Sequence, residues 1–335
     1  MSIKRLVSSF VRKLPSYRAS ENETKNIFNR IDELEKKVDL FFWTLALQQQ
    51  KTDNITEAKK QVFLSMPKAP EPRRTYQLVM NFILQRIKNI CDDNNIDFIL
   101  YGGTLIGAVR HKGFIPWDDD IDIKMFRKDY KRLKEIIAND ELIEINNYYN
   151  VKGEVYIKAK LKESDVFYVD IFLLEYLDIE KNDIAKTKKD LICLSEKLQK
   201  CLAEHIENKM KGLDWSYKRK SEELDIIVND FEQTYLARPF YNNIRAKYVC
   251  DSPINPSWIL YFDGPIINYD TLLPFMHNIL VFEGKNYSSP HKTEAFLNDI
   301  YGDIWTIPES IVPFHSYELN KASREIEKIQ KIAKI

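Results

Sequence analysis

Four aspartates within five positions, Asp118 to Asp120 and Asp122, constrain the fold of this chain more than any other feature. They run into residues 120–125, whose polar and apolar side chains alternate as in a β-strand with one buried face. On a strand, Asp118, Asp120 and Asp122 would project to the same side. Carboxylates this close repel one another unless a cation lies among them, and hard oxygen ligands suit Mg²⁺ or Mn²⁺. We therefore expect a metal site here; the alternative is a polar, aspartate-rich turn.

A glycine pair precedes the acidic stretch. Residues 98–101 form a short apolar run that predicts a strand, Gly102 and Gly103 interrupt it, and residues 104–109 predict a helix. Glycines between a strand and a helix let the backbone approach a ligand closely and direct the first amides of the helix at phosphate. The spacing is neither the dinucleotide-binding fingerprint nor a P-loop. We expect Gly102, Gly103 and Thr104 to contact phosphate beside the metal site.

Four further charged side chains are candidates for the same site. Asp170 lies within the apolar sequence 167–172, where an unpaired carboxylate would be costly. Metal ligation or proton abstraction would account for it, and so would a strand-edge position or a structural salt bridge. Arg110, His111 and Lys112 form a cationic cluster between the glycines and the acids, suited to neutralising the phosphates of a nucleotide substrate. A structural hydrogen-bonding role is the alternative for His111.

Composition excludes several function classes. Lysine plus arginine equals aspartate plus glutamate at 50 each, so no global basic field indicates a nucleic-acid partner. The four cysteines form no C-x-x-C pair, and no cleavable signal peptide is evident at the N-terminus, which favours a reduced, cytoplasmic setting. The longest apolar run, 40–47, is far shorter than the roughly 20 residues needed to cross a bilayer.

The first 74 residues differ in pattern from the rest. Residues 1–18 predict a basic amphipathic helix, which would either lie on the inner face of an anionic membrane or pack on its own domain. Residues 27–48 repeat apolar positions at steps of four and three, as in a short coiled coil that pairs two copies of the chain or folds back. Residues 51–74, with three prolines, predict a linker.

The remaining patterns outline the domain organisation. Helices are predicted over 75–94, 128–137, 293–300 and 321–335; strands over 141–145, 154–161 and 166–173, the last two as a hairpin; turns over 250–265; and an apolar patch over 278–283. We predict an N-terminal extension (1–70), a catalytic domain (71–320) with a helical insertion at about 180–245, and a C-terminal helix (321–335).

The sequence from Gly102 to Asp122 resembles the signature of the LicD/fukutin-related family of phosphotransferases. The resemblance weakens toward 169–172, 281–284 and 301–303 and does not include 1–70. It implies an α+β fold of the nucleotidyltransferase type, a mixed sheet flanked by helices. It also implies transfer of phosphocholine, ribitol phosphate or glycerol phosphate from a CDP-linked donor to a sugar hydroxyl of a surface glycan, such as lipopolysaccharide, capsule or teichoic acid.

The resemblance further implies roles for individual residues. The catalytic, metal-binding acids fall on Asp120 and Asp122, with Asp118 close by and Asp170 as the third carboxylate. Lys124 stands where a small residue is expected, a departure that bears on donor specificity. Two other functions stay open: a nucleotidyltransferase that activates a sugar phosphate with NTP, and a non-catalytic scaffold at the membrane.

Overall fold

The computed structural model describes residues 54–149, 155–177 except 163 and 165, and 278–306, with strands at 249–250, 258–261 and 266–268 and one to three helical residues at a time elsewhere. The predicted segments 1–18, 27–48 except Leu45, most of 180–245, and 321–335 except Glu325 lie outside the described residues. The predictions for those segments therefore stay predictions.

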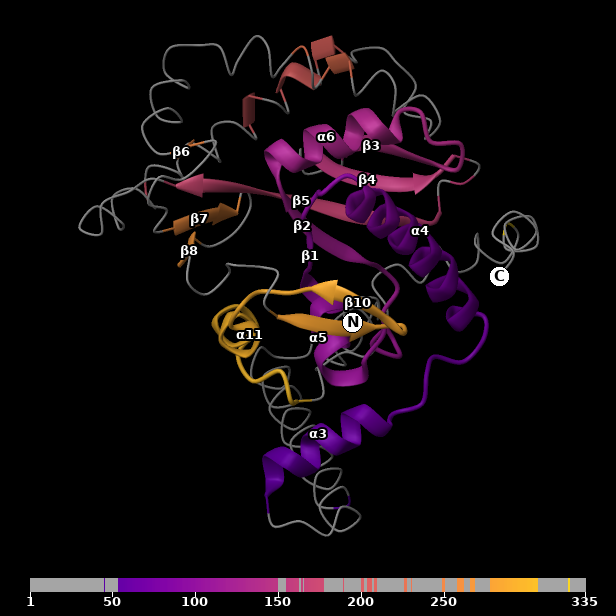
Figure 1. The fold of residues 1–335 in the computed structure, drawn as a ribbon, viewed down its shortest axis with the longest axis vertical. Coiled ribbons are helices and arrows are strands. Elements are labelled where there is room, and N and C mark those ends of the chain that lie inside the picture. Colours follow the sequence, from indigo (N-terminus) through magenta and orange to yellow (C-terminus); the bar gives the residue numbers. More distant parts are fainter. Residues whose placement is uncertain are drawn as a thin grey trace, which may run out of the picture.

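A mixed β-sheet of eight strands forms the centre of the described structure (Figure 1). Its main path is β1-β2-β5-β4-β3, and β2 pairs with β5 in parallel while the other pairs are antiparallel. The strands are β1 (Ile99–Leu100), β2 (Asp122–Phe126), β3 (Ile143–Tyr149), β4 (Val155–Leu161), β5 (Tyr168–Leu177), β6 (Val249–Cys250), β7 (Trp258–Tyr261) and β8 (Ile266–Asn268). The predicted mixed sheet with flanking helices is confirmed. The turn prediction for 250–265 is wrong at β7, which pairs with β5 and β8.

Two helices cover one face of the sheet. α4 (Arg73–Asp93) contacts β4 and β5, and α6 (Arg127–Ile137) contacts β2, β3 and β5 as well as α4. The strand residues on this face are apolar: Ile123 pairs with Ile171, and Ala159 with Val169, all buried in the core. Since side chains alternate along a strand, the opposite face carries the residues between them, which include Asp122 and Asp170.

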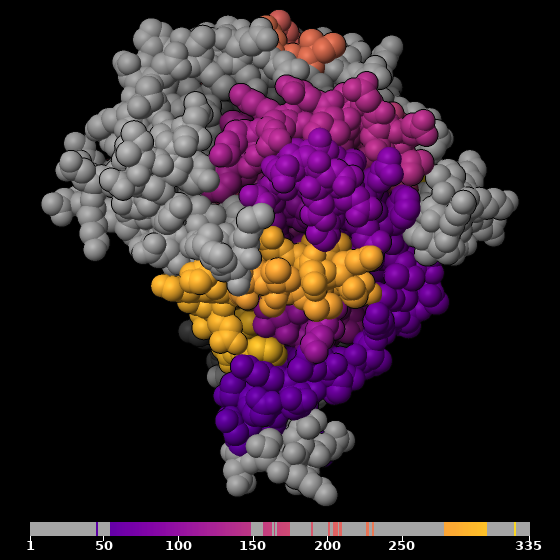
Figure 2. All heavy atoms as spheres, in the orientation of Figure 1, coloured from indigo at the N-terminus to yellow at the C-terminus, as the bar shows by residue number. Residues whose placement is uncertain are grey.

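A smaller unit packs beside β1 and contains the glycine pair. It consists of α5 (Gly102–His111), the antiparallel hairpin of β9 (Ile279–Phe282) and β10 (Lys285–Ser288), and α11 (Thr293–Tyr301). β10 contacts β1, and β9 contacts α5. In Figure 2 the hairpin and α11, in orange and yellow, lie between α4 above and α3 (Ile55–Ser65) below. The predicted helix over 293–300 is confirmed.

The predicted linker over 51–74 is wrong for most of its length, because it contains α3 and the start of α4. Asn54 begins α3 by accepting hydrogen bonds from the N–H groups of Thr56 and Glu57. Ala58 and Phe63 bury its inner face, and α3 contacts α5. The three prolines at 67, 70 and 72 keep only the short connection between the two helices non-helical.

Two predicted boundaries near the acidic stretch also differ. β2 begins at Asp122 and not at position 120, so Asp118 and Asp120 precede the strand and the alternation argument does not apply to them. α5 begins at Gly102, so both glycines belong to its first turn. In the described part of the chain, none of the helices has the length and apolarity to cross a bilayer.

Candidate active site

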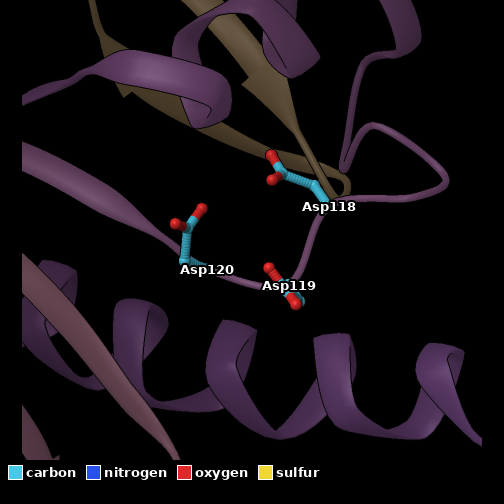
Figure 3. Close-up of side chains that lie close together, drawn as sticks. All are labelled: Asp118, Asp119 and Asp120. Carbon is cyan, nitrogen blue, oxygen red and sulfur yellow. The ribbon is translucent and has the colours of Figure 1, made fainter. Parts of the chain in front are cut away.

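Asp118, Asp119 and Asp120 gather in the irregular segment before β2, which we call the aspartate bend (Figure 3). A turn over 115–118 leads into this segment and is closed by a hydrogen bond of 2.9 Å that the Asp118 N–H donates to the Ile115 carbonyl. One carboxylate oxygen from each of the three aspartates lies within 4.8 Å of the others. Asp119, which is 3% exposed, was not among the predicted ligands, because on a strand it would have pointed away from its neighbours. The bend removes that restriction.

Asp122 and Asp170 extend the acidic group onto the sheet. The parallel register of β2 and β5 places Asp122 directly beside Asp170, so both side chains project from the same face. The Asp170 N–H donates to the Ile121 carbonyl at 2.8 Å, which ties β5 to the residue before Asp122. Burial raises the pKa of Asp122 well above its usual range, and the charges of Asp120, Asp170 and Asp118 raise it further. All four predicted metal ligands therefore belong to one electrostatic group.

This group has the chemistry of a divalent-cation site. Burial raises the pKa of Asp118 strongly, and the neighbouring charges of Asp120 and Asp119 add to that rise. Carboxylates that repel one another in this way are stabilised either by protons or by a cation of high charge density. Their oxygens are the hard ligands that Mg²⁺ and Mn²⁺ prefer. The residues present therefore fit the metal that the sequence pattern predicts.

The glycine pair makes room for two of these carboxylates. A Cβ atom at Gly102 would lie 2.2 Å from Oδ2 of Asp122, and one at Gly103 would lie 2.6 Å from Oδ2 of Asp118. Gly102 also has φ of +57°, which favours glycine. Thr104, buried next to them, accepts a hydrogen bond of 2.9 Å from the Asp122 N–H. The carboxylates thus lie against the positive end of α5. Contact of Gly102, Gly103 and Thr104 with phosphate stays a prediction.

Asp170 also has a cationic neighbour on the sheet. Lys158 on β4 is its cross-strand partner, and Lys158 Nζ lies 3.4 Å from Asp170 Oδ1. The same ammonium lies 3.1 Å from the centre of the Tyr168 ring. The structural salt bridge considered for Asp170 is therefore present. It does not remove Asp170 from the acidic group, because its charge still acts on Asp122.

Comparison with known proteins bears on this arrangement. Residues 95–191 match the family model described as "LicD/FKTN/FKRP, nucleotidyltransferase domain". The resemblance to the LicD/fukutin-related family is thereby confirmed. The matched residues, which we call the LicD-type segment, contain the glycine pair, the aspartate bend, β2 and β5, which carries Asp170.

Curated relatives match over short stretches. Lipopolysaccharide cholinephosphotransferase LicD of Haemophilus influenzae is 46% identical over 79 residues, 24% of this chain and 28% of the relative. An uncharacterised protein of Rickettsia prowazekii is 48% identical over 48 residues, 14% and 18% of the two chains. An uncharacterised protein of Rickettsia typhi is 38% identical over 80 residues, 22% and 26%. Each match spans less than a third of the relative's own length.

At the end of α5, the structure departs from the predicted cationic cluster. Arg110 is 5% exposed, with its guanidinium carbon 3.6 Å from the centre of the Phe63 ring on α3. Burial lowers the Arg110 pKa to about 10, so the side chain stays charged at neutral pH. Burial and the Arg110 charge lower the His111 pKa to about 4, so His111 is neutral and is not a cation there. Lys112 is exposed and ends the helix with φ of +53°.

A buried carboxylate outside the LicD-type segment braces the loop that leads to the aspartate bend. Glu283, at the turn between β9 and β10, accepts hydrogen bonds from Arg74 Nη1 (3.0 Å), Lys68 Nζ (3.0 Å) and the Phe114 N–H (3.2 Å). Its own N–H donates to the Lys112 carbonyl at 3.0 Å. Burial alone would raise the Glu283 pKa, but the hydrogen bonds from Arg74 and Lys68 outweigh burial and lower it.

Gln77 of α4, which is fully buried, also holds this loop in place, at the end where the aspartate bend begins. Its side-chain amide donates to the carbonyls of Ile115 (3.3 Å) and Asp118 (3.0 Å), while Arg74 Nη1 lies 3.4 Å from Gln77 Oε1. Sequence reasoning missed both Glu283 and Gln77. The pair Glu283-Gly284 between two short strands is a hairpin signal that could have drawn attention to the turn. Nothing local marks Gln77, because its role depends on a loop 38 to 41 residues away.

Proposed function

We propose that this chain transfers a substituted phosphate from a CDP-linked donor to a sugar hydroxyl of a cell-surface glycan. The observation that carries the proposal is the gathering of Asp118, Asp120, Asp122 and Asp170 against the first turn of α5. This arrangement lies within a segment that matches the LicD family. The similarity to a cholinephosphotransferase over part of its length agrees with a transferase of this class.

The proposed reaction is an in-line displacement at phosphorus. The acceptor hydroxyl oxygen forms a bond to the phosphorus that carries the substituent, the bond from that phosphorus to the bridging oxygen breaks, and CMP leaves with the electron pair. Asp170 orients the hydroxyl and accepts its proton, which then passes to water. Asp118, Asp120 and Asp122 would hold Mg²⁺ or Mn²⁺. When bound, that ion supplies charge that stabilises the donor phosphates and the departing oxygen.

Other residues are assigned to the donor phosphates. The N–H groups of Gly103 and Thr104, at the positive end of α5, are the proposed phosphate donors beside the carboxylates. Lys112, exposed at the other end of the helix, is free to reach a charged ligand. Arg110 is the weaker candidate, because its guanidinium is buried against the Phe63 ring. His111, neutral at pH 7, adds no charge.

A donor screen tests this proposal. The full chain would be incubated with Mg²⁺, a panel of methyl glycosides, and either CDP-choline, CDP-ribitol or CDP-glycerol, while CMP is measured. We expect metal-dependent CMP release with at least one donor. Release of pyrophosphate from NTP and a sugar phosphate, with no CMP from any CDP-linked donor, would instead favour nucleotidyl transfer. Absence of both products would favour the scaffold alternative.

The N-terminal segments add a proposal about location. We propose that residues 1–18 hold the chain peripherally at the inner face of a membrane, where lipid-linked acceptors are assembled, and that 27–48 pair two copies. Removing residues 1–18 should release the chain from anionic vesicles while activity on soluble glycosides persists. Unchanged vesicle binding would contradict the membrane contact.

A further inference from the structure

Lys124 places an ammonium group against two aromatic rings beside the acidic site, and we call the place that it fills between the rings of Tyr101 and Phe172 the aromatic pocket. Its side chain is 3% exposed, and its Nζ lies 3.6 Å from the centre of the Tyr101 ring and 5.8 Å from that of Phe172. The two rings are 5.5 Å apart and inclined at 61°. A cation within about 6 Å of the centre of an aromatic ring is attracted to the face of that ring, and both rings lie within this distance. Here the cation belongs to the chain itself.

The pocket is continuous with the carboxylates. Lys124 is two residues beyond Asp122 on β2 and pairs with Phe172 just as Asp122 pairs with Asp170, so all four side chains share one face of the sheet. The distance along the strand between the two pairs is about 7 Å. Tyr101 joins the pocket to the site directly, because its N–H donates to the Asp122 carbonyl at 3.0 Å.

The pKa shifts of Asp122 and Tyr101 also indicate that Lys124, Asp122 and Tyr101 lie close together. The charge of Lys124 lowers the pKa of Asp122, against the larger effects of burial and of the other aspartates. Burial raises the pKa of Tyr101, and the charge of Asp122 adds to that rise. Because the two residue pairs lie about 7 Å apart along the strands, a donor whose phosphates lie at Asp122 has its substituent within reach of Lys124 and the two rings.

This pocket discriminates by charge. Aromatic pockets of this kind bind quaternary ammonium groups when they are empty. A quaternary ammonium here would have to displace Lys124 or lie beside it, and repulsion between two cations about 5 Å apart in a partly buried site weakens binding by more than about tenfold. An uncharged polyol has no such repulsion, and its hydroxyl oxygens can accept hydrogen bonds from the ammonium.

We propose that Lys124 sets the donor specificity of this chain, so that the transferred phosphate carries an uncharged polyol and not a quaternary ammonium. The proposal rests on the transferase function proposed above and identifies which class of donor that site accepts. It separates this chain from its Haemophilus relative, whose name states cholinephosphotransferase.

Donor competition tests the proposal. For the unmodified full chain we expect kcat/KM to be at least tenfold higher with CDP-glycerol or CDP-ribitol than with CDP-choline. Lys124→Ala, which empties the pocket, should raise kcat/KM for CDP-choline about tenfold and lower it for the polyol donors. Lys124→Met fills the pocket without charge, serves if the alanine variant does not fold, and should reduce the preference for polyol donors. Preference of the unmodified chain for CDP-choline, or an unchanged ratio in both variants, would overturn the proposal.

A matched control is Lys88→Ala. Lys88 also lies over a tyrosine ring, 5.7 Å from the centre of Tyr287, but on the outer part of α4. Its removal should leave the donor ratio unchanged. A change equal to that of Lys124→Ala would mean that the ratio responds to loss of any such lysine.

A binding measurement separates this proposal from the transferase proposal. Tetramethylammonium would be titrated into the full chain without donor and followed by NMR. We expect binding to Lys124→Ala at least tenfold tighter than to the unmodified chain. Equal binding to both would overturn the role of Lys124, whether or not any donor is turned over. Absence of CMP with every donor, together with the expected difference in tetramethylammonium binding, would overturn the transferase function alone.

Discussion

The chain contains two kinds of buried carboxylate, and their surroundings are opposite. Glu283 is 5% exposed in its side chain and is surrounded by donors: Arg74, Lys68 and a backbone N–H. Asp118 and Asp122 are surrounded mainly by other carboxylates. The pKa of Glu283 is accordingly lowered, whereas the pKa values of Asp118 and Asp122 are raised.

The difference separates a structural group from a functional one. A carboxylate whose hydrogen bonds are all made inside the protein stabilises the fold and needs nothing further. Carboxylates that repel one another weaken the fold, and a chain that keeps them together needs a cation or a proton to complete the arrangement. Glu283 and Gln77 hold the loop in place, so that the aspartates cannot move apart to relieve their repulsion.

The largest expected effect is on activity when the acidic group loses one charge. Asp120→Asn or Asp122→Asn should lower kcat/KM for the CDP-linked donor by about a thousandfold or more, because several kcal/mol of transition-state stabilisation depend on the bound cation. The same substitutions should raise the free energy of unfolding of the metal-free protein by about 1 kcal/mol, since repulsion is relieved. Kinetics and thermal unfolding in EDTA would measure both.

Asp92→Asn is the control for this experiment. Asp92 pairs with Lys88 on the surface of α4 and is exposed, so neither activity nor stability should change appreciably. Near-normal turnover in Asp120→Asn and Asp122→Asn would remove the acidic group from the reaction.

The second effect is on stability, at Glu283 and its charged partners. Glu283→Gln keeps the shape of the side chain but leaves Arg74, which is 14% exposed, without its charged partner. Breaking a buried pair in this way costs about 3 kcal/mol. Lys68→Ala removes another partner of the same carboxylate, but Lys68 is 66% exposed and its loss should cost less than about 1 kcal/mol. Urea unfolding of both variants measures the two losses of unfolding free energy. Equal losses would contradict the distinction between the buried and the exposed partner of Glu283.

The sequence predicted the parts of the site that depend on local order. The glycine pair, the helix after it and the acidic run are neighbours in the chain, and hydrophobic periodicity locates the strands and helices around them and the strand hairpin that carries Asp170. The pairing of Asp122 with Asp170 also agrees with the prediction that both belong to one site. Adjacency in the sequence is sufficient for the glycine pair and the acidic run, whereas the pairing of Asp122 with Asp170 depends on the parallel register of β2 and β5.

The other parts depend on contacts between distant residues. Glu283 meets Phe114 across 169 positions, and Phe63 lies under Arg110 from a segment whose prolines suggested a linker. The bend at Asp118 arises from a backbone turn and from Gln77, so the alternation rule failed there and Asp119 was overlooked. Periodicity within one segment carries no information about which distant side chain will form hydrogen bonds with the backbone of a loop.

A third, smaller effect, on stability and metal affinity, is expected where Thr104 of α5 contacts Asp122 of β2. Thr104→Val removes the hydroxyl that accepts from the Asp122 N–H while keeping the shape of the side chain. A buried donor left unsatisfied costs about 1–3 kcal/mol. Thr104→Ser keeps the hydroxyl and is the control. Its loss of unfolding free energy should be smaller than that of Thr104→Val. Because Asp122 is also displaced, Mn²⁺ affinity measured by EPR should fall in Thr104→Val. Unchanged affinity would mean that Thr104 acts only on stability.

The pH dependence of stability, a change of about 1.4 kcal/mol in unfolding free energy for each unit of pKa shift, tests the comparison between the two kinds of carboxylate. A lowered pKa makes Glu283 stabilising above its unfolded pKa, so its contribution is lost as pH falls through the folded value. Raised pKa values make Asp118 and Asp122 destabilising as pH rises above about 4, where the unfolded state ionises first. The metal-free protein should therefore be most stable near pH 4–5.

Three curves of unfolding free energy against pH, measured in EDTA, would separate the two groups. Asp122→Asn should flatten the loss of stability above pH 5, and Glu283→Gln should flatten the loss below pH 4. Saturating Mg²⁺ should remove the loss above pH 5 in the unmodified chain, because the cation then takes the place of the protons. If stability instead rose steadily from pH 4 to 8 without metal, the aspartates would behave like Glu283, and the distinction between a satisfied carboxylate and a cation-dependent group would fail.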